Sequence, residues 1–250
     1  MTYRSGPQGI RQPFWTMDMP KQQAPGTAPP AAHRALRERA QKILDILEEM
    51  YRDARCSLHF ADPFQLLVAA ILSAQCTDKR VNEITPTLFS HYPTAEALAE
   101  APLRNIEVII RPTGLYRNKA MSLQGAARRI QEAFQGEVPR TVDQLLTLPG
   151  VGRKTAAVVL SNAFGIPAFP VDTHVNRVVN RLGLVHSKDP VKIEKALTEL
   201  FPEERWGRLS HQFIQHGRTL CLARNPRCPE CRLRPLCAYG RSSTAPKPPS

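Results

Sequence analysis

The chain has 250 residues, enough for one large domain or two small domains with cores of their own. Its formal net charge is +12, from 34 Lys and Arg against 22 Asp and Glu, which favours a polyanionic partner, most simply nucleic acid. No apolar run reaches the roughly 18 residues that a membrane span needs, and no charged-then-apolar start resembles a secretory signal. We therefore expect a cytoplasmic protein, associated with the nucleoid if it is bacterial. On charge alone, a merely basic protein and a binder of anionic membrane surfaces remain alternatives.

Both ends of the chain have the composition of tails. Residues 1–31 contain six prolines and little apolar periodicity, and residues 241–250 read RSSTAPKPPS. Such segments bury too little apolar surface to offset the entropy that they lose on ordering. We predict disordered tails over 1–31 and 241–250.

Between the tails the apolar pattern is helical. Residues 31–54 place apolar side chains at helical spacing opposite a charged face. A second helix is predicted over 62–75, with Asp62 as its N-cap and Pro63 at its first position. The middle of this helix, 66–72, is apolar on all sides and should lie in the core.

Further helices are predicted along the rest of the chain. Thr141 and Gln144 have capping-box spacing at the start of one of them. Alternating strand patterns are absent, so the sequence predicts an all-α protein of roughly ten helices. The additional helices are expected over 79–90, 94–100, 102–110, 117–135, 141–147, 153–164, 173–182, 190–200 and 206–220.

Residues 148–156 read LPGVGRKTA and join two of these helices. Gly150 and Gly152 allow positive φ without a Cβ clash and let another molecule approach the main chain. The free N–H groups at the start of the second helix form an anion site suited to a DNA phosphate. Val151 should point inward and hold the two helices together. The alternative is a helix–turn–helix connection that binds nothing.

Lys154 lies in the first turn of the helix after this hairpin. A lysine amine is a nucleophile only when it is neutral. Partial burial, the positive end of the helix dipole and the adjacent Arg153 would all disfavour its charged form. The position therefore fits imine-forming catalysis. Asp172 precedes a predicted helix in FPVDTHVNRVVNR and could assist this lysine or serve as a simple N-cap.

Four of the six cysteines lie close together, with the spacing C-x6-C-x2-C-x5-C. The lack of a secretion signal argues against disulfides. Structural zinc more often uses two separated pairs of ligands, and a 4Fe-4S cluster suits a looser wrap. We favour the iron–sulfur cluster and keep zinc as the alternative. The four candidate ligands are Cys221, Cys228, Cys231 and Cys237.

The same segment contains four arginines, which makes it a candidate phosphate-binding loop. The alternative is that these arginines merely balance the charge of a negative cluster. They are Arg224, Arg227, Arg232 and Arg234.

These motifs together resemble the endonuclease III family, the iron–sulfur DNA glycosylases with AP-lyase activity in the helix–hairpin–helix superfamily. The resemblance is carried by LPGVGRKTA, by VDTHV and by the spacing of the four cysteines, with LLVAAILSAQCTD and TGLYRNKA as further similar segments. It covers about residues 32–240. The long N-terminal extension departs from the compact family pattern.

The resemblance implies a fold of two α domains with a cleft between them. A six-helix barrel carrying the helix–hairpin–helix would span 56–166. The iron–sulfur cluster domain would combine 32–55 with 167–240.

The resemblance also implies roles for individual residues. Lys154 would be the nucleophile at the sugar C1′, and Asp172 its carboxylate partner. Gln75 would fill the hole left by an extruded base, and Leu115 would wedge into the base stack. Without the resemblance, Gln75 would be a polar residue at a helix end and Leu115 a core leucine. The implied DNA contacts are Gln75, Leu115, Gly150, Val151, Gly152, Arg153 and His174.

The implied activity is that of a monomeric bifunctional glycosylase, which removes oxidised pyrimidines from double-stranded DNA and cuts 3′ to the abasic site by β-elimination. Two rival functions remain. An adenine-mismatch glycosylase on the same scaffold is expected to lack a lysine at the position of Lys154 and to carry an additional C-terminal domain. A non-catalytic DNA-binding protein with a structural metal would leave the strand intact.

Overall fold

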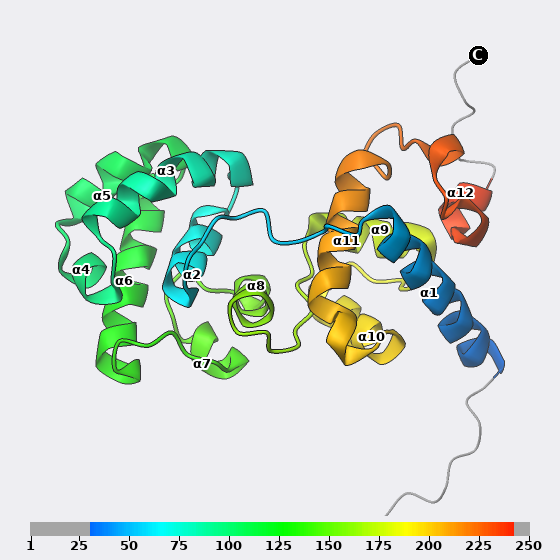
Figure 1. The fold of residues 1–250 in the computed structure, drawn as a ribbon, viewed down its shortest axis with the longest axis horizontal. Helices are drawn as coiled ribbons and strands as arrows, with labels where there is room; N and C mark the ends of the chain where they lie inside the picture. Colours follow the sequence, from blue (N-terminus) through cyan, green and yellow to red (C-terminus); the bar gives the residue numbers. More distant parts are fainter. Residues whose placement is uncertain (1–30, 243–250) are drawn as a thin grey trace, which may run out of the picture.

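The computed structural model describes residues 31–242, apart from the side chain of Ala32. The predicted tails, 1–31 and 241–250, lie outside these residues except at their inner ends, where Ala31 opens the first helix and Arg241 closes the last. Every regular element within the described residues is helical (Figure 1), which confirms the all-α prediction.

The α-helices are α1 (Ala31–Met50), α2 (Pro63–Leu72), α3 (Asp78–His91), α4 (Ala95–Glu100), α5 (Leu103–Ile110), α6 (Tyr116–Phe134), α7 (Val142–Leu146), α8 (Arg153–Ala163), α9 (Thr173–Leu182), α10 (Pro190–Leu200), α11 (Trp206–Thr219) and α12 (Ala238–Arg241). Short 3-10 helices occur at η1 (Arg111–Thr113), η2 (Glu203–Arg205), η3 (Cys228–Glu230) and η4 (Arg234–Leu236).

The helix starts follow the predicted caps. Asp62 accepts a hydrogen bond from the backbone N–H of Gln65 (2.8 Å), and Pro63 is the first residue of α2. Thr141 accepts a bond from the backbone N–H of Gln144 (3.3 Å) at the start of α7. The Thr141 hydroxyl also lies 3.0 Å from the side-chain oxygen of Gln144 and donates to it. That oxygen faces the hydroxyl, so only the first half of the predicted capping box forms.

Two helices end three or four residues earlier than their apolar patterns predict. α1 ends at Met50 rather than at 54, and α2 ends at Leu72 rather than at 75. After Leu72 the chain turns, and Gln75 adopts φ 52°, a left-handed conformation that cannot continue a right-handed helix. α12 was not predicted, because four residues are too few to show an apolar period.

The buried apolar side chains form two cores. One lies among α2 to α8, at the left of Figure 1, and is built from residues within 58–168. The other, at the right, combines 40–51 with residues within 169–233, so that α1 packs beside the C-terminal helices. All seven residues of 66–72 are buried in the first core, as their apolar run predicts.

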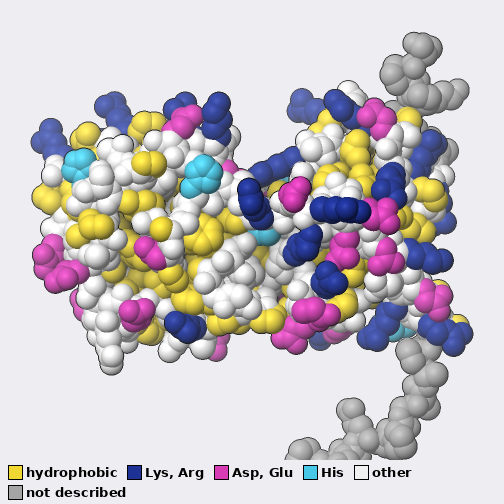
Figure 2. Space-filling view, in the orientation of Figure 1, with side chains coloured by type: hydrophobic (Ala, Val, Ile, Leu, Met, Phe, Trp, Pro, Cys, Tyr) yellow, Lys and Arg dark blue, Asp and Glu magenta, His cyan; other side chains and the backbone are white. Residues whose placement is uncertain are grey.

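The chain passes between the two halves twice, before α2 and after α8 (Figure 1). These crossings put residues of both halves along one junction. In Figure 2, Lys and Arg side chains gather over this junction and over the half that carries α1 and α9 to α12. No helix within residues 31–242 is both long enough and apolar enough to span a membrane.

Candidate active site and nucleic-acid interface

The glycine-rich hairpin joins α7 to α8, and its two glycines differ in what they do. Gly150 has φ 79°, and a Cβ there would lie 2.7 Å from the Cβ of Ser122, so the chain requires glycine at this position. Gly152 has φ −102°, and a Cβ there would meet nothing within 4 Å. The expectation of positive φ is therefore wrong for Gly152. The space beside Gly152 is therefore open, and without a side chain there another molecule can approach the start of α8.

The start of α8 carries the features of an anion site. Gly152 is its N-cap and offers no side-chain oxygen, so the first N–H groups of the helix keep their hydrogen-bonding capacity. Val151 is buried and anchors the turn, as expected. Arg153 is exposed and pairs with Glu194 of α10 at 3.4 Å.

Lys154 and Asp172 line the same cavity of about 240 Å³ between the two cores. Lys154 is exposed in the first turn of α8, so the predicted partial burial is wrong for the free protein. Asp172 is partly buried and is also the N-cap of α9, accepting a bond from the N–H of Val175 at 2.8 Å. The cavity thus brings an amine and a carboxylate together, a combination suited to covalent catalysis with proton transfer.

An ion pair that the sequence did not reveal crosses this cavity. Asp78, the first residue of α3, pairs with Arg218 of α11 at 2.9 Å and accepts a bond from the hydroxyl of Ser57. Burial tends to raise the pKa of Asp78, but the bonds from Ser57 and Arg218 outweigh it and hold this pKa below its usual value. Asp78 stands in the segment LLVAAILSAQCTD, which was noted only as a whole. Its partner lies 140 residues away, so no local pattern marks the pair.

His211 of α11 also lines the cavity, and its Nε2 lies 2.8 Å from the Oδ1 of Asn162 in α8. The bond ties the two halves together. Burial lowers the pKa of His211 to about 4, against a smaller opposing pull from Asp172. His211 is therefore neutral at neutral pH and donates to Asn162 through Nε2.

This histidine should make the folded protein sensitive to mild acid. Between pH 7 and pH 5 the unfolded chain takes up a proton at His211, near the ordinary pKa of about 6.5, while the folded chain does not. The free energy of unfolding should fall by about 1 to 2 kcal/mol more in the wild type than in His211→Gln over this range. Urea unfolding of both proteins at both pH values measures the difference, and equal losses would contradict it.

The residues expected to enter the duplex both stand out from the surface on left-handed backbone. Gln75 is exposed in the turn after α2, with φ 52°. Leu115 is 54% exposed at the start of α6, with φ 47°, so it is not a core leucine. His174 is partly buried, and its Nδ1 lies 3.1 Å from Nη2 of Arg177. Burial lowers the pKa of His174, and Asp172 opposes that shift.

The four predicted cysteine ligands are free thiols that line one cavity among α9, α11 and the C-terminal loop. Polar groups face three of the sulfurs: Arg181 approaches Cys221 at 3.5 Å, His216 approaches Cys231 at 3.7 Å, and the N–H of Gly240 donates to Cys237 at 3.3 Å. Burial raises the pKa of Cys231 to about 11, and the neighbouring thiols add to the shift. Four cysteines around one cavity, one of them buried and three partly buried, have the donor chemistry of an iron–sulfur site.

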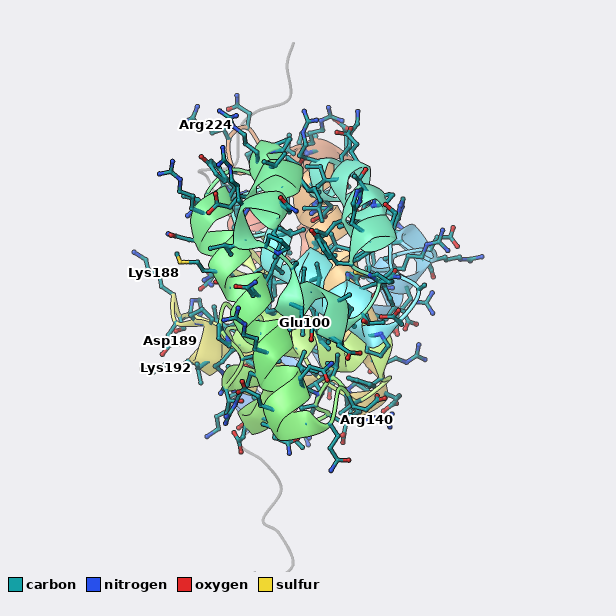
Figure 3. All side chains as sticks on the ribbon, turned by 90° about the vertical axis from the view of Figure 1, so that its left-hand side faces the viewer. Glu100, Arg140, Lys188, Asp189, Lys192 and Arg224 are labelled. Carbon is teal, nitrogen blue, oxygen red and sulfur yellow. The ribbon has the colours of Figure 1, made fainter. Side chains whose placement is uncertain are left out.

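The arginines of the cysteine-rich segment divide into two kinds. Arg232 pairs with Glu49 of α1 at 2.6 Å, and Arg234 donates to the carbonyl of Gly240 at 3.3 Å. Arg224 and Arg227 are exposed and make no ion pair or side-chain hydrogen bond within the described residues. In Figure 3, Arg224 projects from the same edge of the molecule as Lys188 and Lys192. Arg224 and Arg227 are therefore available to a polyanion.

Comparison with known proteins identifies the family of the chain. The sequence model of a protein family, described as "HhH-GPD superfamily base excision DNA repair protein", matches residues 68–203. Endonuclease III of Synechocystis sp. is 53% identical over 208 residues, which are 83% of this chain and 95% of the relative. Endonuclease III of Bacillus subtilis is 49% identical over 199 residues, 79% of this chain and 91% of the relative.

Solved structures agree as well. A non-covalent endonuclease III–DNA complex matches with a TM-score of 0.79 and 46% identity, over 82% of this chain and 96% of that one. A trapped endonuclease III–DNA covalent intermediate, an estranged-adenine complex, gives the same values. These matches are to enzymes, which removes the non-catalytic DNA-binding protein as an alternative. The chain therefore belongs to the HhH-GPD superfamily and, within it, to the endonuclease III family of base excision repair DNA glycosylases and AP lyases.

Proposed function

We propose that this chain is a bifunctional glycosylase that removes oxidised pyrimidines from duplex DNA and then cuts the strand through a lysine imine. The observation that carries the proposal is the shared cavity of Lys154 and Asp172 at the start of α8. The trapped covalent intermediate of a similar protein supports a covalent route. The protein would act as a monomer.

The reaction follows from the chemistry of these two side chains. The target nucleotide must leave the stack, because its glycosidic bond is unreachable within a duplex. Neutral Lys154 attacks C1′, the C1′–N bond breaks, and the base departs with a proton. Opening of the sugar ring then breaks the C1′–O4′ bond, with a proton delivered to O4′, and leaves an iminium between Lys154 and C1′. The iminium acidifies the C2′ proton, whose removal expels the 3′ phosphate by β-elimination. Water then hydrolyses the imine and frees Lys154. Asp172 would accept and return protons and stabilise the cationic sugar.

The hairpin would hold the DNA by a phosphate at the start of α8. Replacing Gly152 by Asp should then lower the affinity for damaged and undamaged duplexes alike, by about tenfold, because a carboxylate would repel the phosphate. The fold should survive, because a Cβ at 152 meets nothing within 4 Å. Fluorescence anisotropy measures the binding, and Gly152→Ala, which adds no charge, is the matched control. Unchanged binding by Gly152→Asp would rule out the phosphate contact.

The cysteines fit a 4Fe-4S cluster held by Cys221, Cys228, Cys231 and Cys237. The four free thiols line one cavity among α9, α11 and the C-terminal loop. The cluster, when bound, would tie the C-terminal loop to α9 and α11. Arg181 and the N–H of Gly240 would offset the negative charge of its thiolates.

Purified protein should therefore be yellow-brown and contain about four irons per chain. Replacing Cys231 by Ser should reduce the iron content and the soluble yield, because the loop loses an anchor. Cys76→Ser, which changes a thiol outside this cavity, should leave the iron content unchanged. Elemental analysis showing stoichiometric zinc without iron would reject the cluster.

The substrate proposal is tested with a panel of labelled duplexes. A duplex with thymine glycol should be cleaved, and duplexes with an oxidised purine or a mismatched adenine should react more slowly. Preference for the mismatched adenine, with base loss but no strand cleavage, would instead identify the monofunctional mismatch enzyme.

A further inference from the structure

A buried lysine stands between the two loops that carry Gln75 and Leu115. Lys119 lies in the first turns of α6, and its side chain is among the few charged groups in the core, with 5% of its surface exposed. Its ammonium donates to the carbonyl of Leu72 at 2.9 Å and to the carbonyl of Thr113 at 2.8 Å. One cation therefore bonds to two separate chain segments.

The two carbonyls are chemically alike. Leu72 is the last residue of α2 and Thr113 the last residue of η1, so each carbonyl lies where a helix leaves acceptors without partners. The C-terminal end of a helix also attracts a cation. Lys119 satisfies both ends at once, which accounts for the burial of a charge that would otherwise be unfavourable.

The exposed residues follow directly after these anchored ends. Gln75 comes three residues after Leu72, and Leu115 comes two residues after Thr113. Both take left-handed backbone conformations, which side chains with a Cβ rarely adopt unless the surroundings impose them. The Lys119 side chain thus fixes the chain just before each of these exposed residues.

We propose that Lys119 is a positioning residue that fixes the Gln75 loop and the Leu115 loop relative to each other, so that both side chains enter the duplex together. The inference rests on the proposed function, in which Gln75 fills the vacated position and Leu115 wedges into the stack. It adds that the position of each loop depends on the same lysine. Loss of the ammonium should release both loops while leaving Lys154 and Asp172 in place.

The test compares activity on a lesion paired in a duplex with activity on the same lesion in a mismatched, flexible site. Lys119→Met keeps the aliphatic stem and removes the ammonium. Activity on the paired lesion should fall about tenfold more than activity on the flexible one, since a misplacement of about 1 Å can cost on the order of 10²-fold and a smaller displacement costs less. Gln124→Met is the matched control, because it removes a 2.7 Å bond from α6 to the carbonyl of Ala101, away from both loops. Gln124→Met should leave the ratio of activity on the paired lesion to activity on the flexible lesion unchanged.

A double-mutant cycle shows whether Lys119 acts through the two side chains. Once Gln75 and Leu115 are both alanine, adding Lys119→Met should lower the ratio no further. An equal loss on both substrates, or an additive effect in the cycle, would overturn the proposal. If Lys119→Met does not fold, Lys119→Gln, which keeps an amide donor, carries the same comparison and should show a smaller loss.

The outcomes separate this inference from the function on which it rests. If the two alanine variants lower the ratio and Lys119→Met does not, only the positioning role fails. If the alanine variants leave the ratio unchanged, wedging itself fails and nothing remains for Lys119 to position. If thymine-glycol duplexes are not cleaved even by the wild type, the proposed function fails.

Discussion

Lys154→Gln should lose strand cleavage at an abasic site by about 10³-fold or more, because the reaction would lack its nucleophile. Binding should change little. The open N–H groups of α8 and the exposed Arg224 and Arg227 remain in the variant, and they supply contacts to phosphates. Cleavage of an abasic duplex and anisotropy of the same duplex measure the two properties separately.

Lys192→Gln is the matched control for this change. It removes an equal charge from an exposed lysine of α10 that lies outside the Lys154–Asp172 cavity. Cleavage by this control should stay close to that of the wild type at saturating DNA. A similar large loss in both variants would show that charge rather than nucleophilicity is at stake.

Asp172→Asn should slow turnover by about 10²- to 10⁴-fold with the fold intact. The amide oxygen can still accept the bond from the N–H of Val175, and asparagine caps helices as well as aspartate does. What the amide cannot do is accept a proton or carry the charge that opposes a cationic sugar. Single-turnover cleavage of a thymine-glycol duplex measures the rate, and thermal unfolding checks the fold.

Asp189→Asn makes the same chemical change at another helix start. Asp189 caps α10 by accepting a bond from the N–H of Val191 at 2.9 Å, and it does not line the Lys154–Asp172 cavity. It should turn over normally. If Asp172→Asn does so as well, Asp172 is only a helix cap.

The sequence predicted those features that depend on near neighbours. The Asp62 cap, the Pro63 start and the all-round burial of 66–72 follow from a few consecutive residues. The same holds for the turn at Gly150, which takes the positive φ that a glycine allows (79°). The prediction for Gly152 was wrong because a glycine can have two roles that the sequence does not distinguish. Gly152 does not take a positive φ but leaves space beside the start of α8.

Local sequence patterns could not predict contacts between residues that are far apart in the chain. Asp78 meets Arg218 across 140 residues, and Lys119 meets Leu72 across 47. Nothing in the local sequence marks Lys119, since a lysine in a polar helix turn reads as a solvated surface residue. Leu115 was correctly treated as exposed only through the family resemblance, because apolarity alone favours burial.

The most direct measurement is chemical trapping of the imine. Borohydride added during the reaction of the wild type with a lesion duplex should reduce the imine to a stable protein–DNA adduct, and mass spectrometry of the peptides should place the adduct on Lys154. Lys154→Gln should give no adduct. An adduct that persists undiminished in Lys154→Gln, or that maps to another residue in the wild type, would contradict Lys154 as the nucleophile and with it the proposed use of the cavity at the start of α8.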